Sequence, residues 1–104
     1  MWIITRNCTE AFDTAKMYSL FVVDEGKPAV RCGLDGQKPM TLGSYATGEQ
    51  CRAVLKNLLK LMELGKTVAQ MPDDAEAARL AEAENVRPKD RAADGKKTVR
   101  RGGS

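Results

Sequence analysis

The chain has 104 residues, the size of one small domain, and a net charge of +3. It contains no histidine. This excludes acid–base catalysis by an imidazole, catalytic triads oriented by histidine and zinc sites with histidine ligands. No apolar run approaches the roughly 20 residues that span a membrane, and no secretory leader is visible, so we expect the protein in the cytoplasm.

The positive charge is concentrated at the end of the chain. Residues 1–65 carry eight basic and seven acidic side chains, and residues 66–86 carry two basic and five acidic ones. Residues 87–104 carry seven basic and two acidic side chains. The net charge is therefore no sign of a basic domain.

Runs of β-branched and aromatic residues in the first part of the chain predict an antiparallel β-meander of four to five strands. The first strand is expected at Trp2–Thr5, followed by a turn with a short extended piece around Phe12. The clearest strand is Lys16–Asp24, and because both of its faces are apolar we expect it to be central in the sheet. Its side chains expected to face the helix are Tyr18, Leu20 and Val22.

Two further strands are joined by a hairpin turn. Residues 28–35 alternate between an apolar and a wet face, and residues 39–45 repeat this alternation. Between them stands the pair Asp35 and Gly36, which favours a tight hairpin turn. The positions expected to point inward are Val30, Cys32, Leu34, Met40 and Leu42.

The apolar period changes to three or four residues from Glu49 onward. One amphipathic helix is therefore predicted over residues 48–64, packed across one face of the sheet, and Gly65 supplies the left-handed residue common just after a helix. The apolar stripe of this helix comprises Cys51, Val54, Leu55, Leu58, Leu61 and Met62.

The stretch LGSYATGEQC, before and into this helix, first suggests a phosphate-binding loop. Gly43 and Gly48 have the spacing of such a loop, but an acid and an amide follow where a lysine and a hydroxyl are needed. Thr47 and Gln50 instead have the spacing of a capping box, in which each side chain binds the other residue's backbone N–H. We therefore interpret the stretch as a helix start.

The remaining residues carry a weaker pattern. Residues 66–72 are typical of a linker, and residues 73–86 predict an Ala-rich acidic helix that buries little surface and is loosely attached. Residues 87–104 are typical of a disordered basic tail. With residues 1–65 as the domain, the expected fold class is α+β: an antiparallel meander packed by one C-terminal amphipathic helix, then the weak helix and the tail.

The arrangement of thiols and carboxylates in the sequence indicates neither a catalytic site nor a metal site. Cys8, Cys32 and Cys51 are odd in number and widely spaced, which suits neither a disulfide framework nor a paired metal site, so we expect three reduced thiols with Cys8 the most exposed. The acidic pairs Asp24–Glu25 and Asp73–Asp74 fit a turn and a helix N-terminus. We therefore predict no catalytic residue, no metal, no cofactor and no enzymatic activity.

One helix cannot cover both faces of the strand at residues 16–24. The side chains expected on the other face are Ile3 (or Trp2), Met17, Phe21 and Val23. This face must meet the Ala-rich helix, a second copy of the chain or a different protein, unless a strongly coiled sheet closes on its own side chains. A partner would bind this face or the edge of the short first strand. The leading hypothesis is a non-enzymatic interaction module that binds a protein partner or forms a homodimer.

The alternative hypothesis is a nucleic-acid accessory protein that uses the basic tail. Four cations within seven residues could contact phosphates, with an affinity that falls with salt: Lys96, Lys97, Arg100 and Arg101. The segment has no aromatic residue that would stack on bases, and a solubilising tail explains the same composition.

The opening MWIIT, the strand KMYSLFVV and the segment LGSYATGEQCRAVLKNLL resemble a pattern found in small uncharacterised bacterial proteins, including ones carried on phages or conjugative elements. The resemblance covers roughly residues 1–64 and implies a compact sheet-plus-helix protein, with no catalytic motif. The order of strands followed by a C-terminal helix is also similar to that of pleckstrin-homology-like domains, which have seven strands.

Overall fold

The computed structural model describes residues 1–86, which form an α+β fold as predicted. The strands are β1 Trp2–Ile4, β2 Ala11–Asp13, β3 Met17–Val23, β4 Ala29–Leu34, β5 Met40–Ser44 and β6 Val68–Gln70. The helices are α1 Gly48–Glu63 and α2 Asp74–Val86, and a 3-10 turn spans Thr14–Lys16. The basic tail predicted at residues 87–104 lies outside the described residues.

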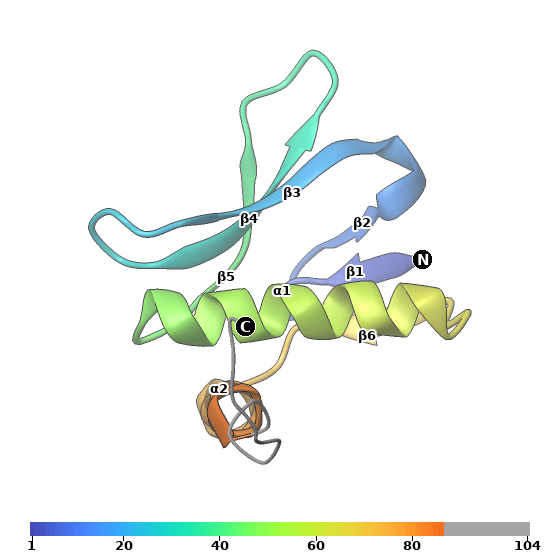
Figure 1. Ribbon diagram of the computed structural model, residues 1–104. Coiled ribbons are helices and arrows are strands. Elements are labelled where there is room, and N and C mark those ends of the chain that lie inside the picture. Colours follow the sequence, from blue (N-terminus) through green and yellow to red (C-terminus); the bar gives the residue numbers. More distant parts are fainter. Residues whose placement is uncertain (87–104) are drawn as a thin grey trace, which may run out of the picture.

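Six strands form two three-stranded sheets in place of the single meander that we predicted (Figure 1). β3, β4 and β5 pair antiparallel in chain order, which confirms the meander over these three strands. β1 lies between β2 and β6, antiparallel to β2 and parallel to β6. The expected edge at the first strand is therefore wrong, because β1 has a neighbour on both sides. The expected central place of β3 is also wrong, because β3 ends its sheet.

The core collects apolar side chains from both sheets and from α1. The predicted inward positions of β4 and β5 are buried or pack against the core, as expected. The intervening Ala29 and Gly33 are buried as well, so the wet face predicted for β4 is wrong at these positions. From α1, the fully buried side chains are Cys51, Val54 and Leu58, each at 1% exposure or less. Burial of such side chains contributes about 1.5–3 kcal/mol each for the larger ones. The sheet–helix packing predicted from the two periodicities is thus the centre of the fold.

Local signals set both ends of α1. At its start, Thr47 Oγ1 accepts a hydrogen bond from the Gln50 N–H at 3.0 Å, so Thr47 is the N-cap as predicted. The return bond differs from the expected one, because Gln50 Oε1 accepts from the Ala46 N–H and not from that of Thr47. At its end, Gly65 takes the expected left-handed conformation with φ +80°, and the Lys66 N–H bonds back to the Leu61 carbonyl at 3.1 Å.

Residues 66–86 belong to the same core as residues 1–65, so our interpretation of a linker and a loosely attached helix is wrong. The linker contains β6, whose Ala69 is buried, and the next residue, Met71, is 2% exposed. α2 lies against α1 (Figure 1) and buries Ala77 and Ala81. Small alanine side chains allow close approach of the two helices, which compensates for the narrow apolar stripe. Within residues 1–86, neither helix combines the length and the apolar character that a membrane crossing requires.

Candidate functional site

The open edge of β3 is the most distinctive surface of the described chain. Among residues 1–86, β3 pairs with β4 alone, and outside this pairing the hydrogen bond of its backbone is the one from the Met17 N–H to the Thr14 carbonyl at the start of the strand. In an antiparallel pair, alternate residues direct their N–H and C=O groups away from the neighbouring strand, so β3 presents free donors and acceptors along that edge. With seven residues it is the longest strand described, and its sequence MYSLFVV contains neither a charge nor a proline.

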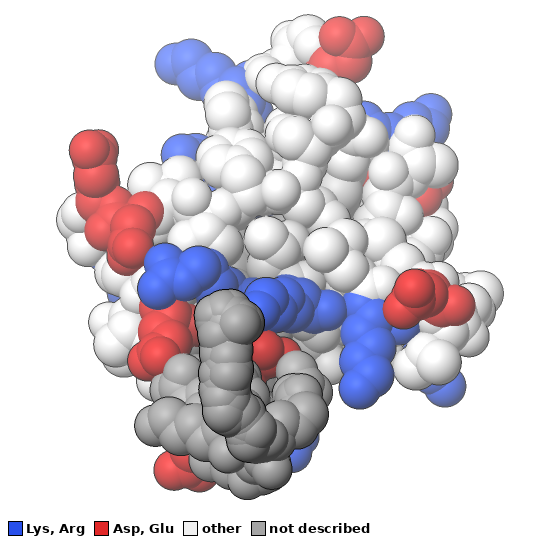
Figure 2. Space-filling model, in the orientation of Figure 1, with Lys and Arg blue, Asp and Glu red and all other residues white. Residues whose placement is uncertain are grey.

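An apolar groove runs between this edge and α1. Its volume is about 280 Å³. The lining residues are Thr14, Met17, Tyr18, Ser19 and Leu20 on the strand side and Leu55, Leu59 and Met62 on the helix side. Tyr18 is 71% exposed and Leu59 is 51% exposed, although both are large apolar side chains. Figure 2 shows this face of the molecule, where the surface over β3 and above α1 carries almost no charged side chain.

A β-bulge decides which side chains of β3 reach the groove. Met17 lies opposite Leu34 and Ser19 lies opposite Gly33, so Tyr18 is an additional residue between them. The bulge turns Met17 inward, where it packs against the core, and leaves Tyr18 outside. A Cβ atom on Gly33 would lie 2.7 Å from Tyr18 Cζ, so the missing side chain of Gly33 makes room for the tyrosine ring.

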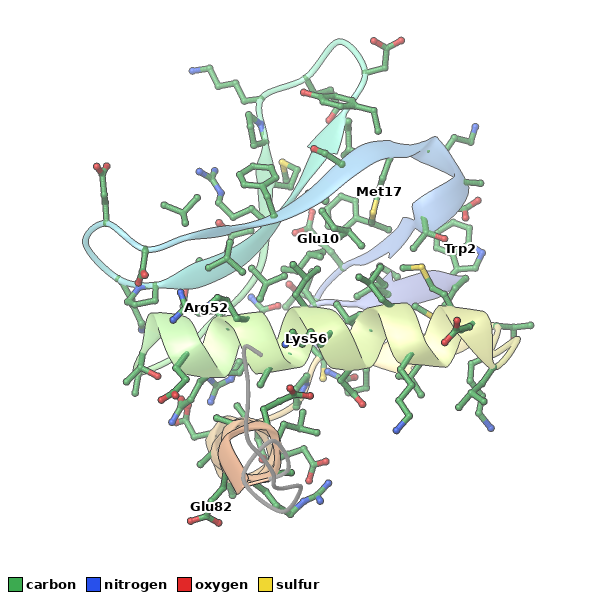
Figure 3. All side chains as sticks on the ribbon, viewed as in Figure 1. Trp2, Glu10, Met17, Arg52, Lys56 and Glu82 are labelled. Carbon is green, nitrogen blue, oxygen red and sulfur yellow. The ribbon has the colours of Figure 1, made fainter. Side chains whose placement is uncertain are left out.

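Charged side chains of α1 lie outside the residues that line the groove. Figures 2 and 3 show basic side chains along α1, among them Arg52 and Lys56. Arg52 Nη1 lies 3.3 Å from Asp24 Oδ2, and Lys56 Nζ lies 3.3 Å from Glu84 Oε1. Both cationic side chains are more than half exposed. Such exposed pairs contribute little to stability, so both cations can exchange their partners.

The structure places the four predicted interface residues in different environments. Ile3 is 0% exposed and belongs to the core, and Met17 also packs against the core, so the expectation that they point away from the helix is wrong. Phe21 and Val23 are half-buried on β3 and are not part of the core cluster. The four tail residues Lys96, Lys97, Arg100 and Arg101 lie outside the described residues.

On the helix side of the groove, the predicted apolar stripe contained Leu55 and Met62 but missed Leu59. Leu59 was absent from the predicted apolar stripe, although it lies four residues after Leu55 and therefore on the same side of α1. The sequence signal for Leu59 is the excess of leucine in α1, because the helix has more apolar side chains than one buried stripe requires. The surplus faces the groove.

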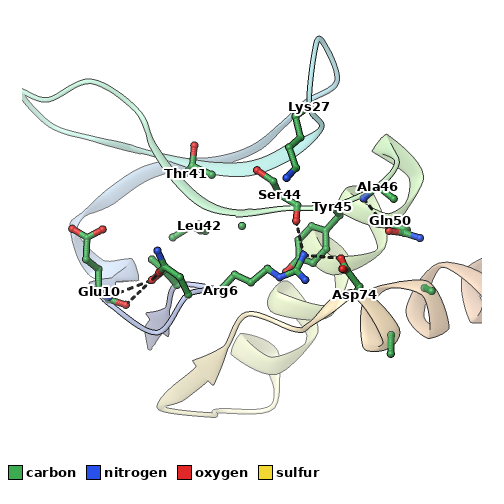
Figure 4. A pocket seen from close by; sticks show the side chains of 15 residues that line it. Arg6, Glu10, Lys27, Thr41, Leu42, Ser44, Tyr45, Ala46, Gln50 and Asp74 are labelled. Atoms are coloured by element: carbon green, nitrogen blue, oxygen red, sulfur yellow. Dashed lines mark hydrogen bonds and ion pairs between the residues drawn. The ribbon is translucent and has the colours of Figure 1, made fainter.

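A second hollow lies on another part of the surface, where residues from the loop after β1, from β5 and from α2 meet around Arg6 (Figure 4). Arg6 Nη1 donates to the Ser44 carbonyl at 2.7 Å and to Asp74 Oδ1 at 2.8 Å. Its guanidinium lies over the ring of Tyr45, 5.0 Å from the centroid, and the Tyr45 hydroxyl donates to the Pro72 carbonyl at 2.7 Å. These contacts join the loop after β1 to the end of β5 and the start of α2, which are distant in sequence. We therefore assign the cluster a structural role.

The electrostatics of this cluster give a prediction about acid stability. The hydrogen bond from Arg6 lowers the pKa of the Asp74 carboxyl. A lowered pKa means that ionised Asp74 contributes stability that is present above its unfolded pKa of about 4 and is lost as the pH falls below it. We therefore expect Asp74→Asn to flatten the decrease in melting temperature between about pH 5 and pH 2, measured by calorimetry.

The control for this prediction is Asp35→Asn, which alters an exposed acid in the β4–β5 turn. It is expected to keep the pH dependence of the natural chain, because no ion pair involves Asp35 among residues 1–86. Equal pH slopes for Asp74→Asn and the natural chain would contradict the role assigned to the Arg6–Asp74 pair.

The thiols do not form a reactive centre within residues 1–86. All three are free, with Cys32 and Cys51 buried and Cys8 exposed, as predicted. Burial raises the pKa of the Cys32 and Cys51 thiols, which disfavours the nucleophilic thiolate. Cys8 lies in a turn with φ +62°, and its Sγ contacts Gln70 Oε1 at 3.5 Å, an amide that cannot act as a base. Within the described part of the chain, no group of three or more acidic or cysteine side chains could hold a metal ion.

No protein-family model matches the chain, and the comparisons with curated proteins and with solved structures give no match either.

Proposed function

We propose that the protein is a non-enzymatic interaction module, which binds an extended polypeptide segment at the edge of β3. The observation that supports this is the combination of an unpaired, uncharged seven-residue edge strand with an apolar groove beside it. An added strand would satisfy the free backbone groups of β3, and its side chains would enter the groove between β3 and α1.

The composition of the edge supports a binding role. Soluble proteins protect exposed edge strands with charged residues, prolines or short length, because an open edge pairs with other chains. Residues 19–23 of β3 have none of these features, and only the bulge at Tyr18 interrupts the regular edge. A strand of this composition, left open, is also prone to aggregate. A partner that covers this edge prevents both pairing with other chains and aggregation.

A photo-crosslinking experiment tests the proposal. Benzoylphenylalanine is introduced in place of Tyr18, beside the groove, and in place of Lys38, an exposed residue of the β4–β5 loop outside it. Irradiation in the producing cell should give a defined polypeptide adduct at position 18, identified by mass spectrometry, and Leu59→Asp should remove that adduct. Adducts that are the same at positions 18 and 38, or that survive Leu59→Asp, would overturn the proposal.

A further inference from the structure

We propose that a third hollow, lined by residues of both sheets, binds an alkylguanidinium group, the group that an arginine side chain carries. The third hollow has a volume of about 600 Å³, which lies in the range of small-molecule sites. β1, β2 and the 3-10 turn contribute to its lining, together with the end of β4 and the turn that follows. It shares no lining residue with the groove beside β3, so the inference is independent of the proposed function.

An exposed tryptophan supplies an aromatic surface to the third hollow. Trp2 is 50% exposed, although it is a large aromatic side chain. It lies at the start of β1, on the outside of the molecule (Figure 3). The face of an indole attracts cations more strongly than the other aromatic rings do, and a planar guanidinium also stacks on it. The exposed ring therefore favours a planar cation.

A carboxylate lies beside this ring. Asp13 is directly opposite Trp2 in the antiparallel pair of β1 and β2, so the two side chains are neighbours on the same face of the sheet. Asp13 Oδ1 accepts from the Ala15 N–H at 3.0 Å, and Oδ2 has no hydrogen-bond partner among residues 1–86. Because each carboxylate oxygen accepts hydrogen bonds, Asp13 keeps an acceptor for a ligand.

A second carboxylate and an apolar part complete the third hollow. Asp35 lines it from the β4–β5 turn, and the one cation among the lining residues is Lys16. Within residues 1–86, neither carboxylate forms an ion pair with this lysine. A guanidinium donates to two acceptors at once, which suits a site with two unpaired carboxylates. Phe12 and Leu34 supply apolar surface that suits the methylene chain of the ligand.

A fluorescence titration of the full chain tests the inference, because the single tryptophan of the chain lies in the third hollow. The probes are agmatine, a blocked Gly-Arg-Gly peptide and its neutral analogue with citrulline in place of arginine, all at constant ionic strength. A guanidinium probe should change the emission saturably, with a dissociation constant of about 1 mM or less, and the citrulline peptide should bind at least about fivefold more weakly. Tighter binding of agmatine would assign the group to a free small molecule, and tighter binding of the arginine peptide would assign it to a polypeptide.

Two substitutions remove the negative charges and preserve the local structure. Asp35→Asn creates an Asn-Gly pair, which favours the same kind of hairpin turn, and Asp13→Asn keeps an oxygen for the Ala15 N–H. Each substitution should raise the dissociation constant of the guanidinium probes by at least about threefold. Lys16→Gln should lower it by about twofold, because it removes a charge of the same sign as the ligand.

The matched control is Glu25→Gln, which removes a negative charge from the β3–β4 turn, outside the third hollow. It should leave the dissociation constant unchanged, and circular dichroism establishes that each variant is folded. Equal binding of the arginine and citrulline peptides, or a dissociation constant that neither aspartate substitution raises, would overturn the inference. An emission change that stays linear up to about 10 mM of both guanidinium probes would also overturn it. The crosslinking result at position 18 is independent of these outcomes, because the edge of β3 lies outside the third hollow.

Discussion

A chain cut after Gly65 is expected to lose cooperative unfolding, whereas a chain cut after Val86 is expected to keep it. The shorter chain lacks the parallel neighbour of β1 and the buried side chains of Ala69, Met71 and Ala77. Burial of a methionine alone contributes about 1.5–3 kcal/mol, and the total stability of a small domain is only about 5–15 kcal/mol. Urea titration followed by circular dichroism distinguishes a sigmoidal transition from a gradual one.

The same truncation removes the polar partners that hold the second hollow together. Pro72, whose carbonyl accepts from Tyr45, and Asp74, which pairs with Arg6, both lie beyond the cut. The chain that ends at Val86 keeps these groups and serves as the control. A sigmoidal transition in the chain of residues 1–65, with a free energy of unfolding within about 1 kcal/mol of the control, would show that residues 66–86 are dispensable for the core.

Local patterns were sufficient to predict the meander β3–β4–β5 and helix α1. Alternation placed Val30, Cys32 and Leu42 inward, and the start and stop of α1 followed from Thr47 and Gly65. These signals act between residues that are close in sequence, where the spacing of side chains determines which face they share. The fold class followed from them.

The first sheet could not be predicted in this way. β1 and β6 are three residues each, and they are paired across more than 60 residues of sequence, so neither has a periodicity that identifies its neighbour. In β1 all three side chains are apolar, and alternation cannot tell that Ile3 is the buried one. Parallel pairing is decided by the packing of the whole core, which no local pattern contains.

The candidate site was predicted in part. The sequence indicated that β3 has more apolar surface than one helix covers, but of the four residues named for that surface only Met17 lines the groove, and the exposed Tyr18 was expected to face the helix. The identity of the exposed residues was missed because strict alternation was extended through position 18, where the bulge shifts it by one residue. A bulge depends on the partner strand, here on Gly33, and the sequence of β3 alone does not reveal it.

Tyr45→Ala is expected to lower the free energy of unfolding by about 3–5 kcal/mol, the range for removal of a large buried aromatic side chain. Tyr45 is 1% exposed and follows the end of β5, where its ring lies beneath the Arg6 guanidinium. Its hydroxyl donates to the Pro72 carbonyl, so the side chain connects the end of β5 to the segment just before α2. Loss of the ring leaves a cavity and also removes the cation–π contact.

Tyr45→Phe separates the ring from the hydroxyl. It keeps the packing but leaves the Pro72 carbonyl without its donor, and we expect a loss of about 1–2 kcal/mol. Tyr18→Ala is the matched control, because Tyr18 is the other tyrosine of the chain and is largely exposed; in dilute protein it should change stability by less than about 0.5 kcal/mol. Urea denaturation measures the free energy of unfolding of each variant. If Tyr45→Ala lowered it as little as Tyr18→Ala does, the ring of Tyr45 would not be part of the core. The contacts that join β5 to α2 would then have to lie elsewhere.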